Sequence, residues 1–201
     1  MTRIIAGVAR GRRLAVPATG TRPTSDHVRE AMFSTMESEL AARGQSWRGV
    51  RVLDLFAGSG ALGLEALSRG AASAVLVEKS RAAAKVATAN AAAIDCPGAE
   101  VLVRDAWQVA GLPPPDGGVD LCFADPPYDW PAGDVRSLLS GLVDAGWLVP
   151  DARVVVERPA KDPASPLPQS WSDTRRRPYG DTALWYGQVK VDRVKELEES
   201  P

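Results

Sequence analysis

Hydrophobic residues recur along this chain with two different spacings. Short apolar runs that end in Asp, Glu, Gly or Pro predict buried strands, because a strand in a covered sheet is apolar on both faces. Stretches with apolar residues three and four positions apart predict helices that bury one face. The expected strands span 51–56, 74–78, 100–103, 119–123 and 153–157. The expected helices begin at the capping candidates 24–26, after Gly60, after Ser80 and at Val135, and end near Gly44, Arg69, Ile94 and Ala145.

This order of elements predicts an α/β fold. Strands that alternate with helices form a parallel sheet with right-handed crossovers. Two last segments, 171–177 and 182–189, flank a Tyr-Gly-Asp turn and predict a hairpin that closes the sheet with an antiparallel strand. At the other end of the chain, segments 4–6 and 14–16 predict a small β-hairpin with arginines at its tip.

The chain divides into three expected parts: a basic N-terminal arm (1–23), the α/β domain (24–189) and an acidic tail (190–201). The net charge of −1 over 201 residues argues against a polycation that coats nucleic acid non-specifically. The arm nevertheless concentrates positive charge, which predicts contacts with nucleic-acid phosphates; a solvated basic face is the alternative. The candidate phosphate-binding residues are Arg3, Arg10, Arg12, Arg13, Arg22 and Arg29.

Several classes of protein are excluded by what the sequence lacks. A single histidine, His27, allows neither a histidine-based metal cluster nor a Ser-His-Asp triad, and we expect no metal. Cys96 and Cys122 have no metal-like spacing and do not suggest a disulfide framework. No apolar run approaches transmembrane length, and the N-terminus lacks the apolar region of a signal peptide. We therefore expect a soluble, cytoplasmic protein with no membrane partner.

The most informative stretch is Asp125-Pro126-Pro127-Tyr128, which follows the apolar run 119–123. The two prolines stop the strand and stiffen the chain, and Pro126 holds the residue before it extended. A carboxylate, a backbone carbonyl and an aromatic face are thus presented at the carboxyl end of a strand, where open α/β sheets bind ligands. Such a platform suits a planar group that carries an exocyclic amine. A proline-rich surface turn is the bland alternative.

A second motif, Gly58 to Gly63, matches G-x-G-x-x-G between a strand and a helix. Glycines let a ligand lie against the backbone, and the helix N-terminus offers unpaired N–H groups. Glu78 ends the next strand, where a carboxylate can bind both hydroxyls of a ribose. This much fits NAD as well as S-adenosylmethionine.

Three acidic residues favour S-adenosylmethionine. Asp54 precedes the glycines, where a carboxylate would repel a pyrophosphate but suits the ammonium and sulfonium of a methionine moiety. Asp105 ends the third strand and can accept from an adenine amino group. Asp125 follows the fourth strand. Each acid alone could cap a helix or lie in solvent, but together they place one polar group at the end of each successive strand.

These motifs resemble those of class I methyltransferases, and more narrowly those of the bacterial RsmD-type 16S rRNA guanine-N2 methyltransferases. The resemblance runs from about residue 3 to 189. It rests on Asp54-Leu55-Phe56-Ala57-Gly58-Ser59-Gly60-Ala61-Leu62-Gly63-Leu64-Glu65-Ala66, on Asp-Pro-Pro-Tyr, on the arginine-rich segments 3–7, 11–14 and 22–30, and on the closing turn 179–182.

The resemblance implies a Rossmann-like fold with a mostly parallel seven-stranded sheet, an antiparallel closing strand and a small N-terminal hairpin. It implies S-adenosylmethionine-dependent methylation of the exocyclic N2 of one guanine in 16S rRNA, within an assembled or partly assembled 30S subunit, by a monomer. The implied catalytic residues are Asp125, Pro126 and Tyr128. The implied cofactor-binding residues are Asp54, Phe56, Ala57, Gly58, Ser59, Gly60, Glu78, Asp105, Ala106 and Asp125.

Three other interpretations stay open at this point. An NAD-dependent oxidoreductase fits the glycine motif but not Asp54 or the Asp-Pro-Pro-Tyr platform. An amino-methyltransferase could act instead on DNA adenine or on a protein glutamine. A non-catalytic RNA-binding or assembly module could retain the fold without the reaction.

Overall fold

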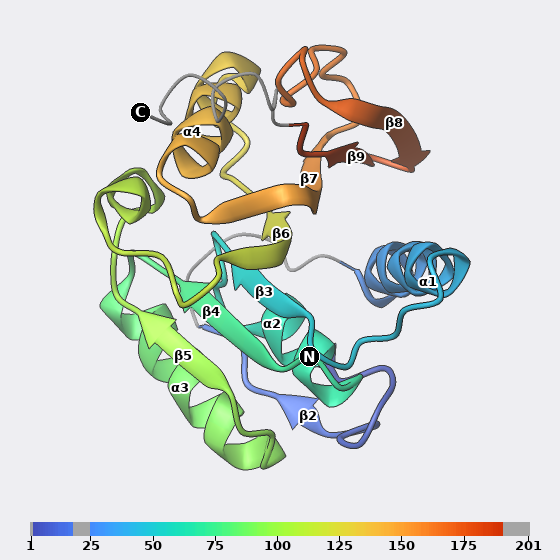
Figure 1. The fold of residues 1–201 in the computed structure, drawn as a ribbon. Helices are drawn as coiled ribbons and strands as arrows, with labels where there is room; N and C mark the ends of the chain where they lie inside the picture. Colours follow the sequence, from blue (N-terminus) through green and yellow to red (C-terminus); the bar gives the residue numbers. More distant parts are fainter. Residues whose placement is uncertain (1, 18–24, 191–201) are drawn as a thin grey trace, which may run out of the picture.

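The computed structural model describes residues 2–17 and 25–190. A seven-stranded sheet forms its centre, with strand order β5-β4-β3-β6-β7-β9-β8 (Figure 1). The first five strands in this order are parallel, and β9 is antiparallel to both β7 and β8. The strands are β3 (Arg51–Asp54), β4 (Ser73–Val77), β5 (Ala99–Leu102), β6 (Val119–Ala124), β7 (Leu148–Pro159), β8 (Ser172–Tyr179) and β9 (Thr182–Gln188). The expected mixed sheet with a closing hairpin is confirmed.

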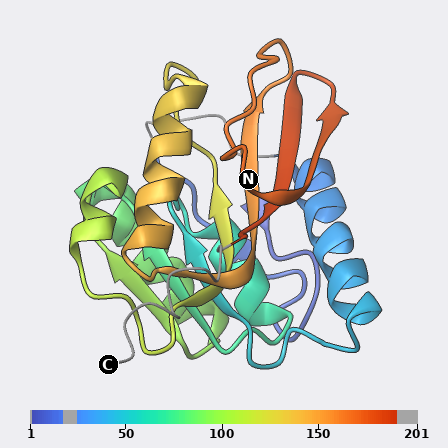
Figure 2. The ribbon, with the colours of Figure 1, turned by 45° about the horizontal axis from the view of Figure 1, so that its top comes forward.

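Helices cover both faces of the sheet (Figures 1 and 2). One face carries α1 (Asp26–Ala42), α2 (Ala61–Ser68) and α3 (Arg81–Ile94), whose apolar side chains share one buried cluster with the sheet. The other face carries α4 (Ala132–Asp144) and the 3-10 helix η1 (Ala106–Gly111). The Oγ of Ser25 accepts from the Val28 N–H, and the Oγ of Ser80 accepts from the Ala83 N–H, so both expected N-caps form.

Four differences from the expected elements have a visible cause. β3 ends at Asp54 rather than at residue 56, because the chain turns there into the glycine loop. β7 is longer than expected, because Leu148 at its start already pairs with Val119 of β6 and its last residues pair with β9. α4 begins earlier, at Ala132, because Pro131 has the extended backbone of an N-cap. η1 was not expected, because a single 3-10 turn has no lasting periodicity.

The N-terminal arm is fastened to the domain by a buried carboxylate. Its two strands, β1 (Thr2–Arg3) and β2 (Arg13–Leu14), pair as an antiparallel hairpin, closer to the chain terminus than expected. Glu65 is 0% exposed, accepts the N–H groups of Ile5 (2.6 Å) and Ala6 (3.0 Å), and pairs with Arg69 (2.8 Å). The arm also contributes to the apolar cluster under α1 and α2. It therefore has a fixed position on the domain.

Gly7 explains how closely the arm approaches α2. Its φ is +81°, and a Cβ at this position would lie 1.8 Å from the carbonyl oxygen of Ser68. Only glycine fits this contact. The last part of the expected arm (18–23), with Arg22, and the tail past 190 lie outside the described residues.

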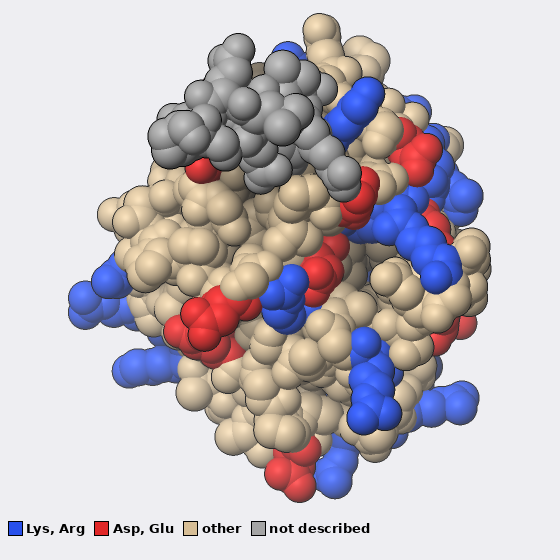
Figure 3. Space-filling model, viewed as in Figure 1, with Lys and Arg blue, Asp and Glu red and all other residues tan. Residues whose placement is uncertain are grey.

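The surface of the described part mixes both signs of charge. On the face shown in Figure 3, basic and acidic side chains lie side by side where α1 meets the β8–β9 hairpin. Within residues 2–17 and 25–190, no helix has the length and apolar character needed to cross a membrane.

Candidate functional site

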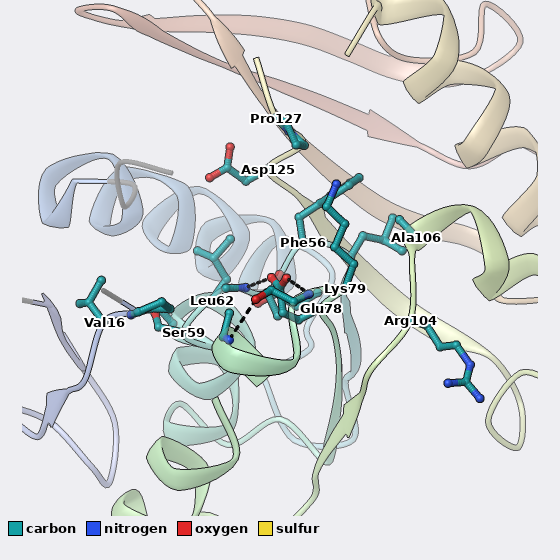
Figure 4. A pocket seen from close by; sticks show the side chains of 18 of the residues that line it. Val16, Phe56, Ser59, Leu62, Glu78, Lys79, Arg104, Ala106, Asp125 and Pro127 are labelled. Atoms are coloured by element: carbon teal, nitrogen blue, oxygen red, sulfur yellow. Dashed lines mark hydrogen bonds between the residues drawn. The ribbon is translucent and has the colours of Figure 1, made fainter. Parts of the chain in front are cut away.

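A cavity of about 280 Å³ opens at the carboxyl ends of β3, β4, β5 and β6 (Figure 4). It brings together nine of the predicted cofactor-binding residues from four separate strand ends. The residues that line it and were predicted are Asp54, Phe56, Ala57, Gly58, Ser59, Glu78, Asp105, Ala106 and Asp125. The predicted residues Gly60, Pro126 and Tyr128 adjoin the cavity in sequence but do not line it.

The glycine loop leaves the cavity floor open. Gly58 (φ +52°) and Gly60 (φ +81°) both adopt the left-handed conformation. A Cβ at Gly58 would meet no atom within 4 Å, so the space beside this residue is free for a ligand. Gly63 serves packing instead, because a Cβ there would lie 2.1 Å from the side chain of Leu76. The N-terminus of α2 follows directly, and Ala61 lines the cavity.

Glu78 connects the glycine loop to the following helix. One carboxylate oxygen accepts from the Gly58 N–H (2.9 Å), and the other accepts from the Ser80 N–H (2.7 Å; Figure 4). Each oxygen keeps a further lone pair. The side chain is thus held at the cavity wall, with acceptor capacity left for a ligand.

Asp54 is the buried charge of the site. Its Oδ2 accepts from the Gly63 N–H (3.1 Å), whereas its Oδ1 has no hydrogen-bond partner. Burial raises the pKa of this carboxyl group to about 7, and the nearby charge of Glu78 adds to the effect. A cation bound in the cavity would favour the ionised form, which fits the predicted interaction with an ammonium or sulfonium.

The Asp-Pro-Pro-Tyr segment leaves β6 as a rigid turn. Asp125 and Pro127 line the cavity, and the Trp130 N–H donates to the Pro127 carbonyl (3.0 Å). Arg158, which is buried, donates to the carbonyl of Trp130 (2.6 Å) and pairs with Asp162. Tyr128 is 59% exposed. The ring of Tyr128 is therefore accessible to solvent, next in sequence to Pro127 of the cavity.

Three aromatic rings from different segments pack together beside the Asp-Pro-Pro-Tyr turn. Phe56 and Trp130 meet edge to face (5.2 Å between centroids), and Trp107 stacks on Trp130 (5.5 Å, 19° between planes). The carboxylate of Asp105 accepts from the Trp107 N–H (3.1 Å) and so caps η1 in addition to lining the cavity. Its side chain also takes part in a capping box with Gln108, so the helix cap, one of the alternatives open for this acid, forms here.

The candidate arginines divide into two groups. Arg3, Arg10, Arg12 and Arg13 are exposed, and Arg22 lies outside the described residues. Arg29 is only 1% exposed, lines the cavity, and donates to the Arg3 carbonyl (2.8 Å) and to Asp26 (2.7 Å). This placement does not favour the predicted contact between Arg29 and an RNA phosphate at the surface. The spacing of Arg29 from Met32, Phe33 and Met36 is that of the buried helical face, which was a visible signal.

The cavity also includes residues that were not predicted. Most are neighbours in sequence of predicted residues, and their roles depend on chain turns that motifs do not specify. Thr2, Val16 and Pro17 come from the arm, whose packing against the domain no sequence spacing gives. The remaining unpredicted residues are Leu55, Ala61, Leu62, Lys79, Ser80, Ala83, Arg104, Pro127 and Trp130. Among the described residues, no group of three or more His, Cys, Asp or Glu is placed to hold a metal ion.

Comparisons with known proteins agree on one family. The family model described as Conserved hypothetical protein 95 matches residues 2–188. The chain is 37% identical over 185 residues to Ribosomal RNA small subunit methyltransferase D of Escherichia coli (strain K12), covering 90% of this chain and 86% of that protein. It is 34% identical over 188 residues to Putative rRNA methyltransferase YlbH of Bacillus subtilis (strain 168), covering 90% and 96%. A solved structure titled Putative methyltransferase yhhF from Escherichia coli superposes with a TM-score of 0.79 at 36% identity, covering 95% and 99%.

Proposed function

This chain belongs to the Conserved hypothetical protein 95 family, that of the RsmD-type methyltransferases, and we propose that it methylates the exocyclic N2 of a guanine in 16S rRNA. One observation carries the proposal. Asp125 and Pro127 line the same cavity as the glycine loop and Glu78, so a group bound at the Asp-Pro-Pro-Tyr turn lies next to a cofactor bound over the glycines.

S-adenosylmethionine fits the polar groups of the cavity. Gly58 leaves open space at the N-terminus of α2, Glu78 offers carboxylate lone pairs to ribose hydroxyls, and Asp54 has one buried oxygen without a partner. Asp105 and Ala106 also line the cavity, where Asp105 would accept from an adenine amino group. Two buried or half-buried carboxylates favour a cationic ligand over a pyrophosphate, which supports S-adenosylmethionine over NAD. When bound, this cofactor supplies a methyl group activated by a sulfonium.

Asp125 and the Pro126 carbonyl would orient the amine. The lone pair of a guanine N2 is delocalised into the ring, so the nitrogen is a poor nucleophile. Two acceptors that bind its N–H groups direct the lone pair toward the methyl group and stabilise the positive charge that develops on nitrogen. Positioning supplies much of the rate in such a displacement. Asp125 need not be a strong base beforehand, because the nitrogen becomes acidic as the methyl group arrives.

The exposed groups around the cavity would hold the RNA. Tyr128 would stack on the extruded base, as aromatic side chains do when a nucleotide leaves its stack. Arg3, Arg10, Arg12 and Arg13 would contact phosphates and position the RNA without reading its sequence. The substrate would be an assembled or partly assembled 30S subunit, the enzyme would act as a monomer, and both would be cytoplasmic.

The test is transfer of a radiolabelled methyl group from S-adenosylmethionine. Unmodified 30S subunits, naked 16S rRNA, DNA and a protein extract are offered in parallel, and the labelled product is digested to nucleosides. We expect label in N2-methylguanosine from 30S subunits or 16S rRNA, and their ratio measures how much the particle helps to present the target.

Each other outcome contradicts a different part of the proposal. Label in DNA or protein would replace the substrate and keep the cofactor. Binding of the cofactor with no transfer to any substrate would favour a non-catalytic module. Binding of NAD in place of S-adenosylmethionine would refute the cofactor assignment.

A further inference from the structure

Two aromatic side chains are exposed next in sequence to residues that line the cavity. Five large hydrophobic side chains are exposed in the described part of the chain, and Trp107 and Tyr128 are the two aromatic ones. Trp107 follows Ala106 and Tyr128 follows Pro127, both of which line the cavity. Single exposed apolar residues need no explanation, but an exposed aromatic ring beside a cavity is a candidate binding surface.

Trp107 is the exposed ring of the Trp107–Trp130 pair. Trp130 lines the cavity and covers one face of Trp107, which does not itself line the cavity. Trp107 is nevertheless 46% exposed. Because one face is covered, its accessible surface lies on the other face and at the ring edge, outside the space that the cofactor would fill.

The two tryptophans are held in place before any ligand binds. The Trp130 backbone is fixed by the Pro127 carbonyl and by buried Arg158, and the Trp107 backbone is fixed by the Asp105 cap. A ring that is already ordered loses little conformational freedom when a ligand stacks on it. This makes Trp107 a suitable stacking platform.

A positive charge accompanies this platform. Arg104 is exposed, and its Nη1 donates to the carbonyl of the preceding Val103 (3.0 Å). In Figure 4 its side chain points away from Glu78 and toward the outside of the cavity. An exposed flat ring and an exposed cation, three residues apart in the chain after β5, match a nucleobase with its phosphate, since single-stranded nucleic acids are bound by stacking and by charge together.

We propose that Trp107 stacks on a second nucleobase of the RNA, a neighbour of the target nucleotide, while Arg104 contacts the adjoining phosphate. This inference rests on the proposed function, and it extends that function by assigning a second base-binding position. Two unstacked bases would then leave the RNA loop together, one inside the cavity beside Tyr128 and one outside it on Trp107.

The experiment compares Trp107→Ala and Trp107→Phe with the wild type. Val103→Ala is the matched control, because it also shortens an exposed apolar side chain next in sequence to a residue that lines the cavity, but it removes no ring. The RNA probe is a single-stranded heptanucleotide with one guanine flanked by adenines, and two further probes carry an abasic ribose on one side of the guanine or the other. Affinity for each probe and for S-adenosylmethionine is measured separately, alongside KM and kcat on unmodified 30S subunits.

We expect Trp107→Ala to weaken binding of the intact probe by about 5- to 100-fold, the range that stacking on one base supplies. KM should rise, and kcat and cofactor affinity should change little. Trp107→Phe should restore most of the affinity, and Val103→Ala should retain it. One of the two abasic probes should bind the wild type and Trp107→Ala equally.

Two results would overturn the inference. Equal affinity of the wild type and Trp107→Ala for the intact probe, or no binding of that probe by the wild type, would remove the second base position. Loss of S-adenosylmethionine affinity in Trp107→Ala would assign the ring to the cofactor instead. Failure of the proposed function is distinguishable, because it would appear as no methyl transfer by the wild type whatever the probe affinities.

Discussion

The two edges of the parallel sheet each carry a cavity, and their polar groups differ. At the carboxyl edge, the cavity of about 280 Å³ contains Asp54 with an unpartnered oxygen. At the amino edge, a larger cavity of about 550 Å³ lies between the end of α1 and the start of β6 and β7. Size alone would therefore direct attention to the wrong edge.

The polar side chains of the amino edge are paired with one another. Glu39 bridges Arg153 (2.6 Å) and Arg175, and Arg153 also pairs with Asp173 (3.3 Å). A cavity whose charges already satisfy one another has little free energy to gain from a ligand. Glu39 of the amino edge has cationic partners, whereas Asp54 forms no ion pair with a described residue. The comparison indicates that a buried carboxylate without a cationic partner, rather than volume, marks the functional edge.

The largest expected effect is a loss of kcat, and it should distinguish two aspartates near opposite ends of β6. Asp125→Asn should lower kcat by about 10²- to 10⁴-fold, because the acceptor that orients the amine is lost. Cofactor affinity should change little. Asp120→Asn removes a carboxylate that holds Arg51 at the amino edge (2.9 Å), and it should lower stability by about 1 kcal/mol without affecting kcat. Steady-state kinetics measure the loss of kcat in each variant, and thermal unfolding measures the loss of stability. An equal loss of kcat in Asp125→Asn and Asp120→Asn would refute the contrast between the edges.

The same comparison predicts opposite pH dependences of stability. The pKa of Asp54 is raised to about 7 by burial, so the folded state binds its proton more tightly than the unfolded state does. Its contribution to stability is lost as pH rises from about 4 to 7, by roughly 2–4 kcal/mol. Hydrogen bonds from Arg51 lower the pKa of Asp120 despite partial burial, so its contribution is lost as pH falls below 4.

Thermal unfolding of the wild type, Asp54→Asn and Asp120→Asn at pH 3, 5 and 8 tests the signs of these two pH dependences. Between pH 5 and pH 8, the free energy of unfolding of the wild type should fall relative to that of Asp54→Asn. A constant difference between these two proteins would show that Asp54 has the same pKa in the folded and unfolded states, and it would contradict the effect of burial. S-adenosylmethionine should bind the wild type more weakly as pH falls below 7, because the carboxylate that favours its positive charge becomes protonated.

A smaller effect is expected from the exposed arginines of the arm. Replacing Arg10, Arg12 and Arg13 together by Gln should weaken RNA binding by about 10- to 100-fold and reduce the slope of log K against log salt by about 2. The control replaces Arg43 and Arg48, which line the cavity at the amino edge. It should leave the slope unchanged. Filter binding at four salt concentrations provides both slopes, and an unaltered slope in the arm variant would refute its contact with phosphates.

The smallest effect is expected inside the ion-pair network of the amino edge. Glu39→Gln should leave kcat, KM and cofactor affinity as in the wild type, and it should lower stability by about 1 kcal/mol, because Arg153 and Arg175 would lose a shared carboxylate. A change in catalysis greater than that in stability would assign function to this edge as well.

The sequence predicted the elements and residues that depend on local patterns. The strand ends that place Asp54, Glu78 and Asp125 follow from apolar runs stopped by polar residues, and the glycine loop follows from its spacing. The parallel sheet and its closing hairpin were also predictable, because strands alternate with helices and the last two segments flank a Tyr-Gly-Asp turn.

What escaped prediction depends on packing between distant segments. Thr2 reaches the cavity only because Glu65 holds the arm, and no pattern links residues so far apart in the chain. Arg29 was taken for a surface charge, although its position on the apolar face of α1 was visible. Trp107 was overlooked together with η1, although Asp105 and Gln108 have the spacing of a capping box.

The buried carboxylate of Glu65 has a consequence for how a target would be chosen. It fixes the arm along α2, an eight-residue helix about 12 Å long, whose first residue lines the cavity and whose last residue contacts Gly7. The distance between the arginine-bearing tip and the cavity is thus constant. An RNA held at both places must present a phosphate and an unstacked base at that separation, so a rigid arm can select a folded particle by its dimensions, even where the nucleotide sequence is common.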